Sequence, residues 1–253
     1  MIHEAAARGF AQAAEAYERG RPGYASEAVE HLCGVLEIEP GRTVLDLAAG
    51  TGKLTRLLVP TGAELVAVEP VEEMRAALAR ALPEVIAVAG TAEDVPLSDA
   101  AVDAVVVGSA FHWFRGDEAL AEIHRVLRPG GRLGLLWNVR DESVSWVAGL
   151  TEIMEPHRGA APGYASGAWR EAFGRTPLFS RLRHAEFRHV HRLEREAVVA
   201  RVASVSFVAA LSESDRADVL ARVRVLLAGD PETRGREVVE LPYRTDVWWC
   251  AAG

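Results

Sequence analysis

Two carboxylates and a glycine turn between them are the residues best suited to chemistry in this sequence. Asp46 ends the apolar run VLDL, and the small residues Ala48–Gly52 follow before a helix-like pattern begins near Lys53. Val and Leu favour a buried strand, while glycine allows a tight reversal that brings backbone close to a ligand. Glu69 ends the next apolar run, 23 residues after Asp46. This spacing predicts a cofactor crevice in which Glu69 accepts hydrogen bonds from two neighbouring ribose hydroxyls.

The glycine pattern bears on which ribose-containing cofactor the crevice holds. A dinucleotide-binding turn carries three glycines as GxGxxG, whereas Gly50 and Gly52 are followed by Thr55 at the third position. Asp46 stands where the approach to a pyrophosphate normally stays apolar, and its carboxylate suits the ammonium of a methionyl group. The residues therefore favour S-adenosylmethionine (SAM), with an NAD(P)-linked oxidoreductase as the less favoured alternative.

Three further motifs follow in the order that a SAM crevice needs. They read GTAEDVPL at 90–97, GSAFHWF at 108–114 and EIHRVLRPGG at 122–131. Together with VLDLAAGTGKLT at 44–55, they resemble the motifs of the class I SAM-dependent methyltransferases of the type 11 kind. The resemblance covers roughly 41–138, and the order of four motifs is more specific than any one of them.

The resemblance implies a set of cofactor-binding residues. The glycine turn holds the methionyl part in that family, the backbone of Ala92 and the side chain of Glu93 face the adenine, and the stretch beginning at Ser109 passes under the sulfonium. The N-terminal set around Tyr17 and Arg21 looks like that of trans-aconitate-type enzymes, where such residues fold over the methionyl carboxylate. The implied cofactor-binding residues are Tyr17, Arg21, Asp46, Ala48, Gly50, Gly52, Glu69, Pro70, Ala92, Glu93, Ser109 and Ala110.

Several of these residues also allow a purely structural interpretation. Asp46 and Glu69 are acids at strand ends, so each could cap a neighbouring turn. Tyr17 could simply pack, and Arg21 could be a solvated charge. Glu93 follows Thr91, which could cap a short helix near 93–95. The joint pattern favours cofactor binding for the first two residues, and for Glu93 both interpretations can hold together.

His112 is the candidate catalytic residue, because an imidazole has a pKa suited to proton removal near neutral pH. The alternatives are that His112 shapes the acceptor pocket or is a hydrogen-bonded structural histidine. Predicted substrate-side residues are Phe111, Trp113, Asn138 and Arg140. We expect no metal site, since the nearby histidines His184, His189 and His191 lack a suitable ligand spacing.

The pattern of apolar runs predicts an α/β fold with a doubly wound, Rossmann-like, seven-stranded sheet. Strands with nearly continuous apolar residues, such as 102–108, are typical of parallel sheets covered on both faces. We expect strands at 43–48, 64–69, 85–89, 102–108, 132–138, 179–193 and 237–250. We expect helices at 53–60, 71–81, 117–128, 194–211 and 213–228, others before residue 40, and a short one near 93–95. The last strand is expected to run antiparallel.

We expect one methyltransferase domain over 1–253 with four parts. These are an N-terminal helical lid (1–40), a SAM-binding core (41–138), a cap or substrate region (139–175) and C-terminal strands and helices (176–253). The cap contains Trp146, Tyr164, Trp169 and Phe173, which suggests a small, partly apolar acceptor.

Composition limits the partners. The formal net charge of −8 opposes general attraction to nucleic acid or anionic membrane. The N-terminus lacks the basic start and apolar block of a secretory signal, and Cys33 and Cys250 imply no disulfide framework. We therefore expect a cytoplasmic monomer or homodimer that methylates a small molecule, most plausibly on a carboxylate or hydroxyl oxygen. Nitrogen or carbon methylation and a non-catalytic SAM-binding module are the open alternatives.

Overall fold

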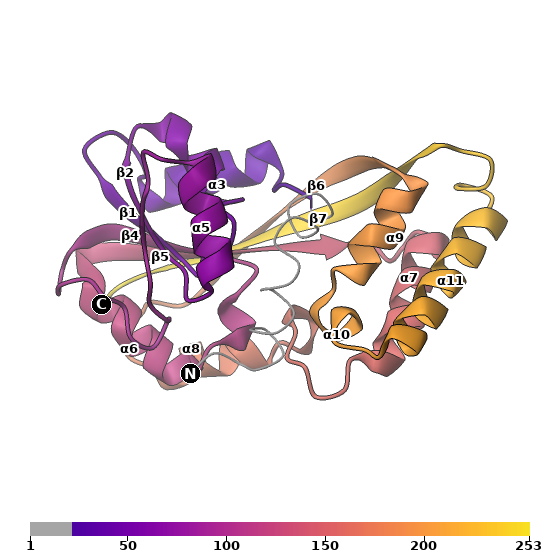
Figure 1. Ribbon diagram of the computed structural model, residues 1–253. Coiled ribbons are helices and arrows are strands. Elements are labelled where there is room, and N and C mark those ends of the chain that lie inside the picture. The colour runs from indigo at the N-terminus through magenta and orange to yellow at the C-terminus, as the bar shows by residue number, and fades with distance from the viewer. Residues whose placement is uncertain (1–21) are drawn as a thin grey trace.

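The computed structural model describes residues 22–253, and the predicted residues Tyr17 and Arg21 lie outside this range (Figure 1). The sheet has the strand order β3-β2-β1-β4-β5-β7-β6. Its strands are β1 (Thr43–Leu47), β2 (Glu64–Val68), β3 (Ile86–Val88), β4 (Val102–Gly108), β5 (Leu127–Arg140), β6 (Arg183–Glu194) and β7 (Val238–Ala251). The helices are α3 (Ser26–Leu36), α4 (Thr55–Leu58), α5 (Glu72–Ala81), α6 (Gly116–Val126), α7 (Ser145–Met154), α8 (Glu171–Arg175), α9 (Arg195–Ala203), α10 (Ser206–Ala209) and α11 (Glu213–Gly229).

The predicted doubly wound, seven-stranded sheet is confirmed. Strands β1 to β5 pair in parallel, and β7 pairs antiparallel with both β5 and β6. Helix α3 covers one face, where Leu32 and Val44 of β1 belong to one buried cluster, and α6 covers the other, where Ile123 and Leu45 belong to another. Since β1 is covered on both sides, its apolar residues are continuous rather than alternating.

The long strands β5, β6 and β7 run beyond the parallel part of the sheet and carry a second core. Trp146 and Leu150 of α7 are buried there with Val198 of α9, Val223 of α11 and Tyr243 of β7. Figure 1 shows α7, α9, α10 and α11 grouped at the far end of the β6–β7 pair, away from the parallel strands. We call these four helices the helical lobe.

Several expected elements differ from those observed. The segment 93–95 is a turn rather than a helix, because Thr91 and Asp94 bond to each other through their backbones. The expected helix 53–60 is α4 followed by a 3₁₀ turn, Val59–Thr61, which contains Pro60. The expected helix 194–211 is two helices, α9 and α10, and β6 begins at Arg183 rather than residue 179.

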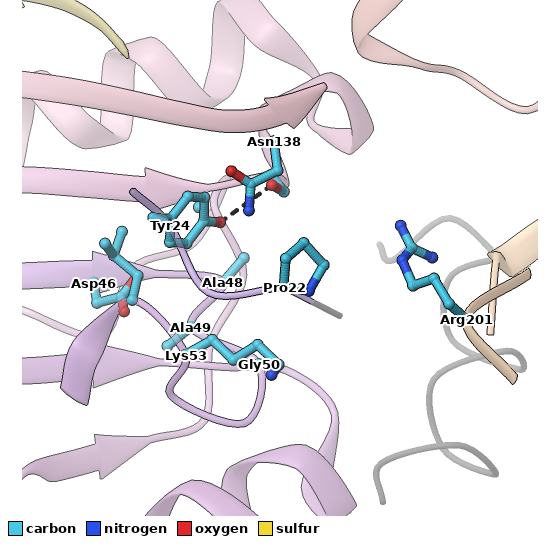
Figure 2. A pocket seen from close by; sticks show the side chains of 12 residues that line it. Pro22, Tyr24, Asp46, Ala48, Ala49, Gly50, Lys53, Asn138 and Arg201 are labelled. Atoms are coloured by element: carbon cyan, nitrogen blue, oxygen red, sulfur yellow. Dashed lines mark hydrogen bonds between the residues drawn. The ribbon is translucent and has the colours of Figure 1, made fainter. Parts of the chain in front are cut away.

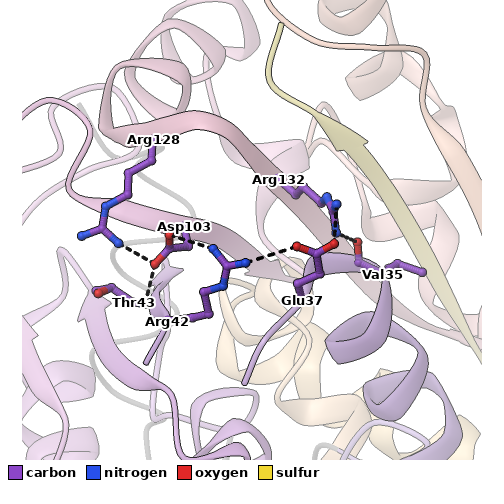
Figure 3. Close-up of polar contacts among 7 residues, drawn as sticks. All are labelled: Val35, Glu37, Arg42, Thr43, Asp103, Arg128 and Arg132. Atoms are coloured by element: carbon purple, nitrogen blue, oxygen red, sulfur yellow. Dashed lines mark hydrogen bonds and ion pairs between the residues drawn. The ribbon is translucent and has the colours of Figure 1, made fainter. Parts of the chain in front are cut away.

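A chain of charges ties the amino ends of the strands together (Figure 3). The carboxylate of Asp103 in β4 accepts a hydrogen bond from the backbone N–H of Thr43 at 2.8 Å. It also forms ion pairs with Arg42 at 3.4 Å and Arg128 at 2.5 Å. Glu37 continues the chain from Arg42 to Arg132. These contacts lie at the edge opposite the carboxyl strand ends, so they brace the sheet away from the ligand crevice.

Candidate active site

A cavity of about 880 Å³ opens at the carboxyl ends of the parallel strands. A smaller cavity of about 60 Å³ adjoins it. The walls that the two share come from the turns after β1 and β4, from β5 and from α9: Ala48, Gly50, Gly108, Ser109, Asn138 and Arg201. Strand order reverses between β1 and β4, which is where sheets of this kind bind ligands. The larger cavity has the size of a cofactor and substrate site.

Asp46 lies at the bottom of the smaller cavity and is almost completely buried. Its Oδ2 accepts a hydrogen bond from the Thr55 hydroxyl at 2.6 Å. Its Oδ1 accepts no hydrogen bond from any described residue. Burial raises the pKa of this carboxyl to about 7. A buried carboxylate oxygen without a partner is costly, so the site calls for a positively charged donor, such as the ammonium of a methionyl group.

Glu69 lies in the larger cavity and caps the neighbouring turns. Its two carboxylate oxygens accept backbone hydrogen bonds from Gly50 at 2.8 Å and Val71 at 2.9 Å. Burial raises the pKa of this carboxyl against the opposing effect of those two bonds. Each oxygen keeps a second lone pair for a ligand hydroxyl. The capping interpretation is therefore observed, and the ribose contact stays a prediction.

The backbone is strained on both sides of the crevice. Ala48 and Ser109 have φ values of +58° and +56°, in the left-handed region that few side-chain-bearing residues adopt. Such strain clusters at functional sites. Gly52, with φ +84°, does not line either cavity: a Cβ there would lie 3.1 Å from Leu78 Cγ. Gly52 lets the turn pack against α5, and its contact with the cofactor stays a prediction.

The other end of the larger cavity contains the residues predicted for the adenine side. Pro70, Ala92 and Glu93 line it, as does Ala110 from the turn after β4. One oxygen of Glu93 accepts a hydrogen bond from the backbone N–H of Arg115 at 3.0 Å. Within the described range, the structure thus brings to the two cavities every predicted cofactor residue except Gly52.

His112 also lines the larger cavity, and its ring is oriented by Trp137. The indole N–H of Trp137 donates to Nδ1 of His112 at 3.1 Å. An indole nitrogen can only donate, so Nδ1 must be the acceptor, and a neutral ring then carries its proton on Nε2. The one lone pair of the neutral ring is occupied by Trp137. Proton removal by His112 would require that this hydrogen bond breaks, which disfavours the predicted base role.

The aromatic residues divide between cavity and core. Phe111 is only 1% exposed, does not line either cavity and packs against the rings of Phe114 and Phe173 at 5.4 Å and 5.2 Å. The 3₁₀ turn at 111–113 directs this ring into the core, so the structure does not place Phe111 on the predicted substrate side. Trp113 does line the cavity. Of the four expected cap aromatics only Tyr164 does so; Trp146, Trp169 and Phe173 pack in the two cores.

The predicted substrate residues Asn138 and Arg140 both line the larger cavity. The Asn138 amide donates to the carbonyl of Gly23 at 3.0 Å and accepts from the Thr245 hydroxyl at 2.7 Å. Asn138 therefore holds the segment before α3 against β5 and β7. Arg140 donates to the Thr151 hydroxyl of α7 at 3.2 Å.

Two arginines, Arg158 and Arg201, are among the cavity residues that sequence reasoning missed. Figure 2 shows Arg201 reaching from α9 toward the smaller cavity, on the side opposite Asp46. Neither arginine belongs to a recognisable motif. The chain is rich in arginine, so nothing in its spacing distinguishes these two. Tyr24 follows Tyr17 and Arg21 in the N-terminal set of residues, and its hydroxyl lies 3.1 Å from that of Ser109.

The described residues, 22–253, show no sign of a metal site or of a membrane-spanning helix. That range contains no group of three or more histidine, cysteine or acidic side chains that could hold a metal ion. His184 bonds to Asp246, whereas His189 stacks on Tyr243. None of the described helices is both long and apolar enough to cross a membrane.

Comparison with known proteins agrees with this geometry. A methyltransferase domain model matches residues 45–135. An uncharacterized methyltransferase of Mycobacterium tuberculosis is 42% identical over 93% of this chain and 92% of its own length. An uncharacterized methyltransferase-like protein of Schizosaccharomyces pombe is 34% identical over 90% of each chain.

Solved structures share the fold at lower identity. A protein of Anaeromyxobacter dehalogenans assigned to the type II methyltransferases is 23% identical, with a TM-score of 0.69 over 92% of this chain and 97% of that one. The geranyl diphosphate C-methyltransferase of Streptomyces coelicolor, solved with S-adenosyl-L-homocysteine, has a TM-score of 0.51 at 15% identity, over 90% and 76% of the two chains. The chain therefore belongs to the class I SAM-dependent methyltransferases, as its motifs predict.

Proposed function

We propose that this enzyme transfers the methyl group of SAM to an oxygen of a small molecule, and that the oxygen belongs to a carboxylate. The cofactor is S-adenosyl-L-methionine, which supplies an activated methyl group on a sulfonium. The observation that supports its placement best is the buried Oδ1 of Asp46, which accepts no hydrogen bond from a described residue and matches a methionyl ammonium. Glu69 would accept from the ribose, and Ala92 and Glu93 would face the adenine.

The state of His112 favours an acceptor that has already lost its proton. A carboxylate attacks a methyl carbon with an oxygen lone pair and releases no proton, so it needs no general base. A phenol, alcohol or amine must lose a proton during transfer. The lone pair of His112 is engaged by Trp137, and Glu155 is a weak base because its hydrogen bond to Arg158 lowers its pKa. The protein then contributes alignment and exclusion of water.

The charges around the two cavities suit a cationic cofactor. Asp46, Glu69 and Glu93 line the part that would hold it, and acidic side chains are complementary to a sulfonium and an ammonium. The remaining part of the larger cavity, which we call its acceptor half, is lined by Arg140 and Arg158 together with Glu142 and Glu155, and Arg201 lines both cavities. Arg140 and Arg158 would pair with the carboxylate of an acceptor.

We also propose that the chain is one domain, as expected from the sequence. In this proposal 41–138 holds the cofactor, residues 22–40 and 139–175 enclose the site, and 176–253 complete the sheet and the helical lobe; the first part of the predicted N-terminal lid lies outside the described residues. A cytoplasmic monomer or homodimer that acts on a small molecule, rather than on nucleic acid, fits the net charge of −8.

Two experiments test the proposal. Calorimetric titration with SAM and with NADH checks the cofactor, and binding of NADH without SAM would refute it. A mass-spectrometric screen then compares small carboxylic acids with the matching primary amides, alcohols and amines. We expect a mass gain of one methylene unit on the acids. Gain only on amines or carbon acids would refute the carboxylate assignment, and SAM binding with no methylated product would favour a non-catalytic module.

A further inference from the structure

The side chain of Tyr164 connects the wall of the larger cavity to strand β7 of the sheet. Tyr164 lies in a 3₁₀ turn, Tyr164–Ser166, between α7 and α8. Its hydroxyl donates to Oδ2 of Asp246 at 2.6 Å and accepts from the indole N–H of Trp248 at 3.1 Å. Burial raises the pKa of Tyr164 to about 12, so the hydroxyl keeps its proton and stays a donor at neutral pH.

The acceptor of this hydrogen bond is held rigidly. Asp246 is fully buried in β7, which pairs with β5 on one side and β6 on the other. Arg244 donates to its Oδ2 at 3.0 Å, and Nε2 of His184 lies 3.2 Å from its Oδ1. Asp246 is therefore a fixed point for whatever bonds to it.

The segment that carries Tyr164 has few other ties to the sheet. Among the hydrogen bonds described for residues 159–168, those of the Tyr164 hydroxyl reach β7, and the rest stay within 158–170. Gly159 and Gly167, both with positive φ, flank the segment and leave its ends conformationally free. We call residues 159–168 the cap loop.

The ring of Tyr164 continues the connection toward the site. Its centroid lies 4.8 Å from that of Trp137, which is only 2% exposed. Trp137 in turn donates its indole N–H to His112. A packed path thus runs from Asp246 through Tyr164 and Trp137 to a residue of the cavity wall.

We propose that Tyr164 is a positioning residue: its hydrogen bond to Asp246 latches the cap loop over the acceptor half of the cavity and, through Trp137, fixes the orientation of His112. The assignment of this half of the cavity to the acceptor rests on the proposed function. The latch itself does not, because it involves residues of this chain alone and can be observed without an acceptor.

The test compares two tyrosine hydroxyls in the same cavity wall. Tyr164→Phe removes the latch and keeps the ring. The matched control is Tyr243→Phe, since the buried hydroxyl of Tyr243 has no hydrogen-bond partner among the described residues. Two measurements report on the latch. They are hydrogen exchange of peptides covering 159–168, and the indole ¹⁵N–¹H resonances, assigned with Trp137→Phe and Trp248→Phe.

We expect Tyr164→Phe to speed exchange of the cap loop about tenfold, which corresponds to loss of one hydrogen bond to a charged group. We also expect the Trp137 and Trp248 resonances to move, whereas Tyr243→Phe changes none of these signals. A purely structural role would lower the stability without moving the Trp137 resonance. Unchanged exchange of the cap loop, or an unmoved Trp137 resonance, overturns the proposal.

The SAM affinity of Tyr164→Phe should stay within about twofold of the unmodified chain. Absence of SAM binding in both proteins would count against the proposed function and not against the latch.

Discussion

At the scale of single residues, the buried Oδ1 atom of Asp46 gives the clearest indication of a ligand. One oxygen of Asp46 is satisfied by Thr55, and the other is buried without a partner among the described residues. An unpaired buried oxygen is costly, and a positively charged donor on a ligand would remove that cost. This single atom distinguishes a methionyl site from a pyrophosphate site, which would need donors instead.

The substitution Asp46→Asn tests this indication. An amide oxygen can still accept from Thr55, so the sheet should fold, but the charge facing the ligand is lost. A charge-assisted hydrogen bond contributes about 1.5–3 kcal/mol, so we expect SAM to bind about 10- to 100-fold more weakly by calorimetry. Affinity equal to that of the unmodified chain would exclude an ammonium contact at Asp46.

The raised pKa of Asp46, about 7, predicts a pH dependence of SAM binding. Below that pH the free protein holds a proton that the ammonium must displace, so the dissociation constant should rise about tenfold per pH unit. Above it the affinity should level off. Calorimetry from pH 5.5 to 8.5 in two buffers checks both the slope and the proton release. A flat profile contradicts the prediction.

The same shift affects folding in the opposite direction. Since the folded state binds this proton more tightly than the unfolded chain, the contribution of Asp46 to stability is present at low pH and is lost as pH rises through about 7. Urea unfolding of the ligand-free chain and of Asp46→Asn across this range should reveal the difference. If the two lose stability in parallel, Asp46 is not the group responsible.

His112→Asn separates positioning from proton removal. The amide oxygen of asparagine can accept the Trp137 indole N–H at the place of Nδ1, but it has no basic lone pair. With an acid found in the screen, we expect kcat to fall less than about tenfold and the pH profile to keep its shape. Loss of one limb of the profile, or a fall of about 10²-fold or more, would restore His112 as the base.

At the scale of elements, the two turns that frame the crevice use glycine for different reasons. Gly52 has φ +84°, and a Cβ there would meet Leu78 and Leu82 at 3.1 Å. Gly108 ends β4, and a Cβ there would lie 2.7 Å from the hydroxyl of Tyr24. The first glycine serves the packing of the turn on α5, and the second leaves room for a flexible side chain that lines the smaller cavity.

Gly52→Ala and Gly108→Ala should therefore affect different properties. We expect Gly52→Ala to lower the free energy of unfolding by about 1–3 kcal/mol through backbone strain, measured by urea denaturation. Gly108→Ala should cost less stability but displace Tyr24 and weaken SAM binding about 3- to 10-fold. The same pattern of effects from both variants would contradict this division.

At the scale of the whole molecule, the sheet is braced at one end and opens at the other. The ion pairs around Asp103 bridge the amino ends of β1, β4 and β5, whereas the carboxyl ends diverge to form the cavity. The helical lobe contributes Arg201 and Thr151 to the same cavity, so the cavity lies between the two cores.

Asp103→Ala measures the brace independently of the site. It removes the hydrogen bond to the Thr43 N–H and two partly exposed ion pairs, whose worth is reduced by solvent. We expect the free energy of unfolding to fall by about 1–2 kcal/mol, with SAM affinity unchanged. A weaker SAM affinity would mean that the two edges of the sheet are coupled.

Features that depend on residues close together in the sequence could be predicted, whereas features that depend on contacts between distant segments could not. The turn Ala48–Gly52 and the acids at the ends of β1 and β2 could be predicted, because glycine conformation and strand-end position are local properties. Phe111 could not be placed, since one 3₁₀ turn decides whether an aromatic ring faces the cavity or the core. The positions of Arg158 and Arg201 at the cavity could not be predicted, because segments that are distant in the chain must pack together to bring these side chains there.

The sequence by itself determined the family, the doubly wound sheet with its antiparallel last strand, and the acid–glycine–acid pattern predicted for the cofactor crevice. These depend on hydrophobic runs and short motifs that lie close together in the chain. Only the tertiary structure decided that one oxygen of Asp46 has no partner within residues 22–253, that Trp137 occupies the lone pair of His112, and that Tyr164 is bound to Asp246. Each of these depends on atoms brought together from different elements, and a hydrogen bond forms or fails over a few tenths of an ångström that sequence spacing does not specify.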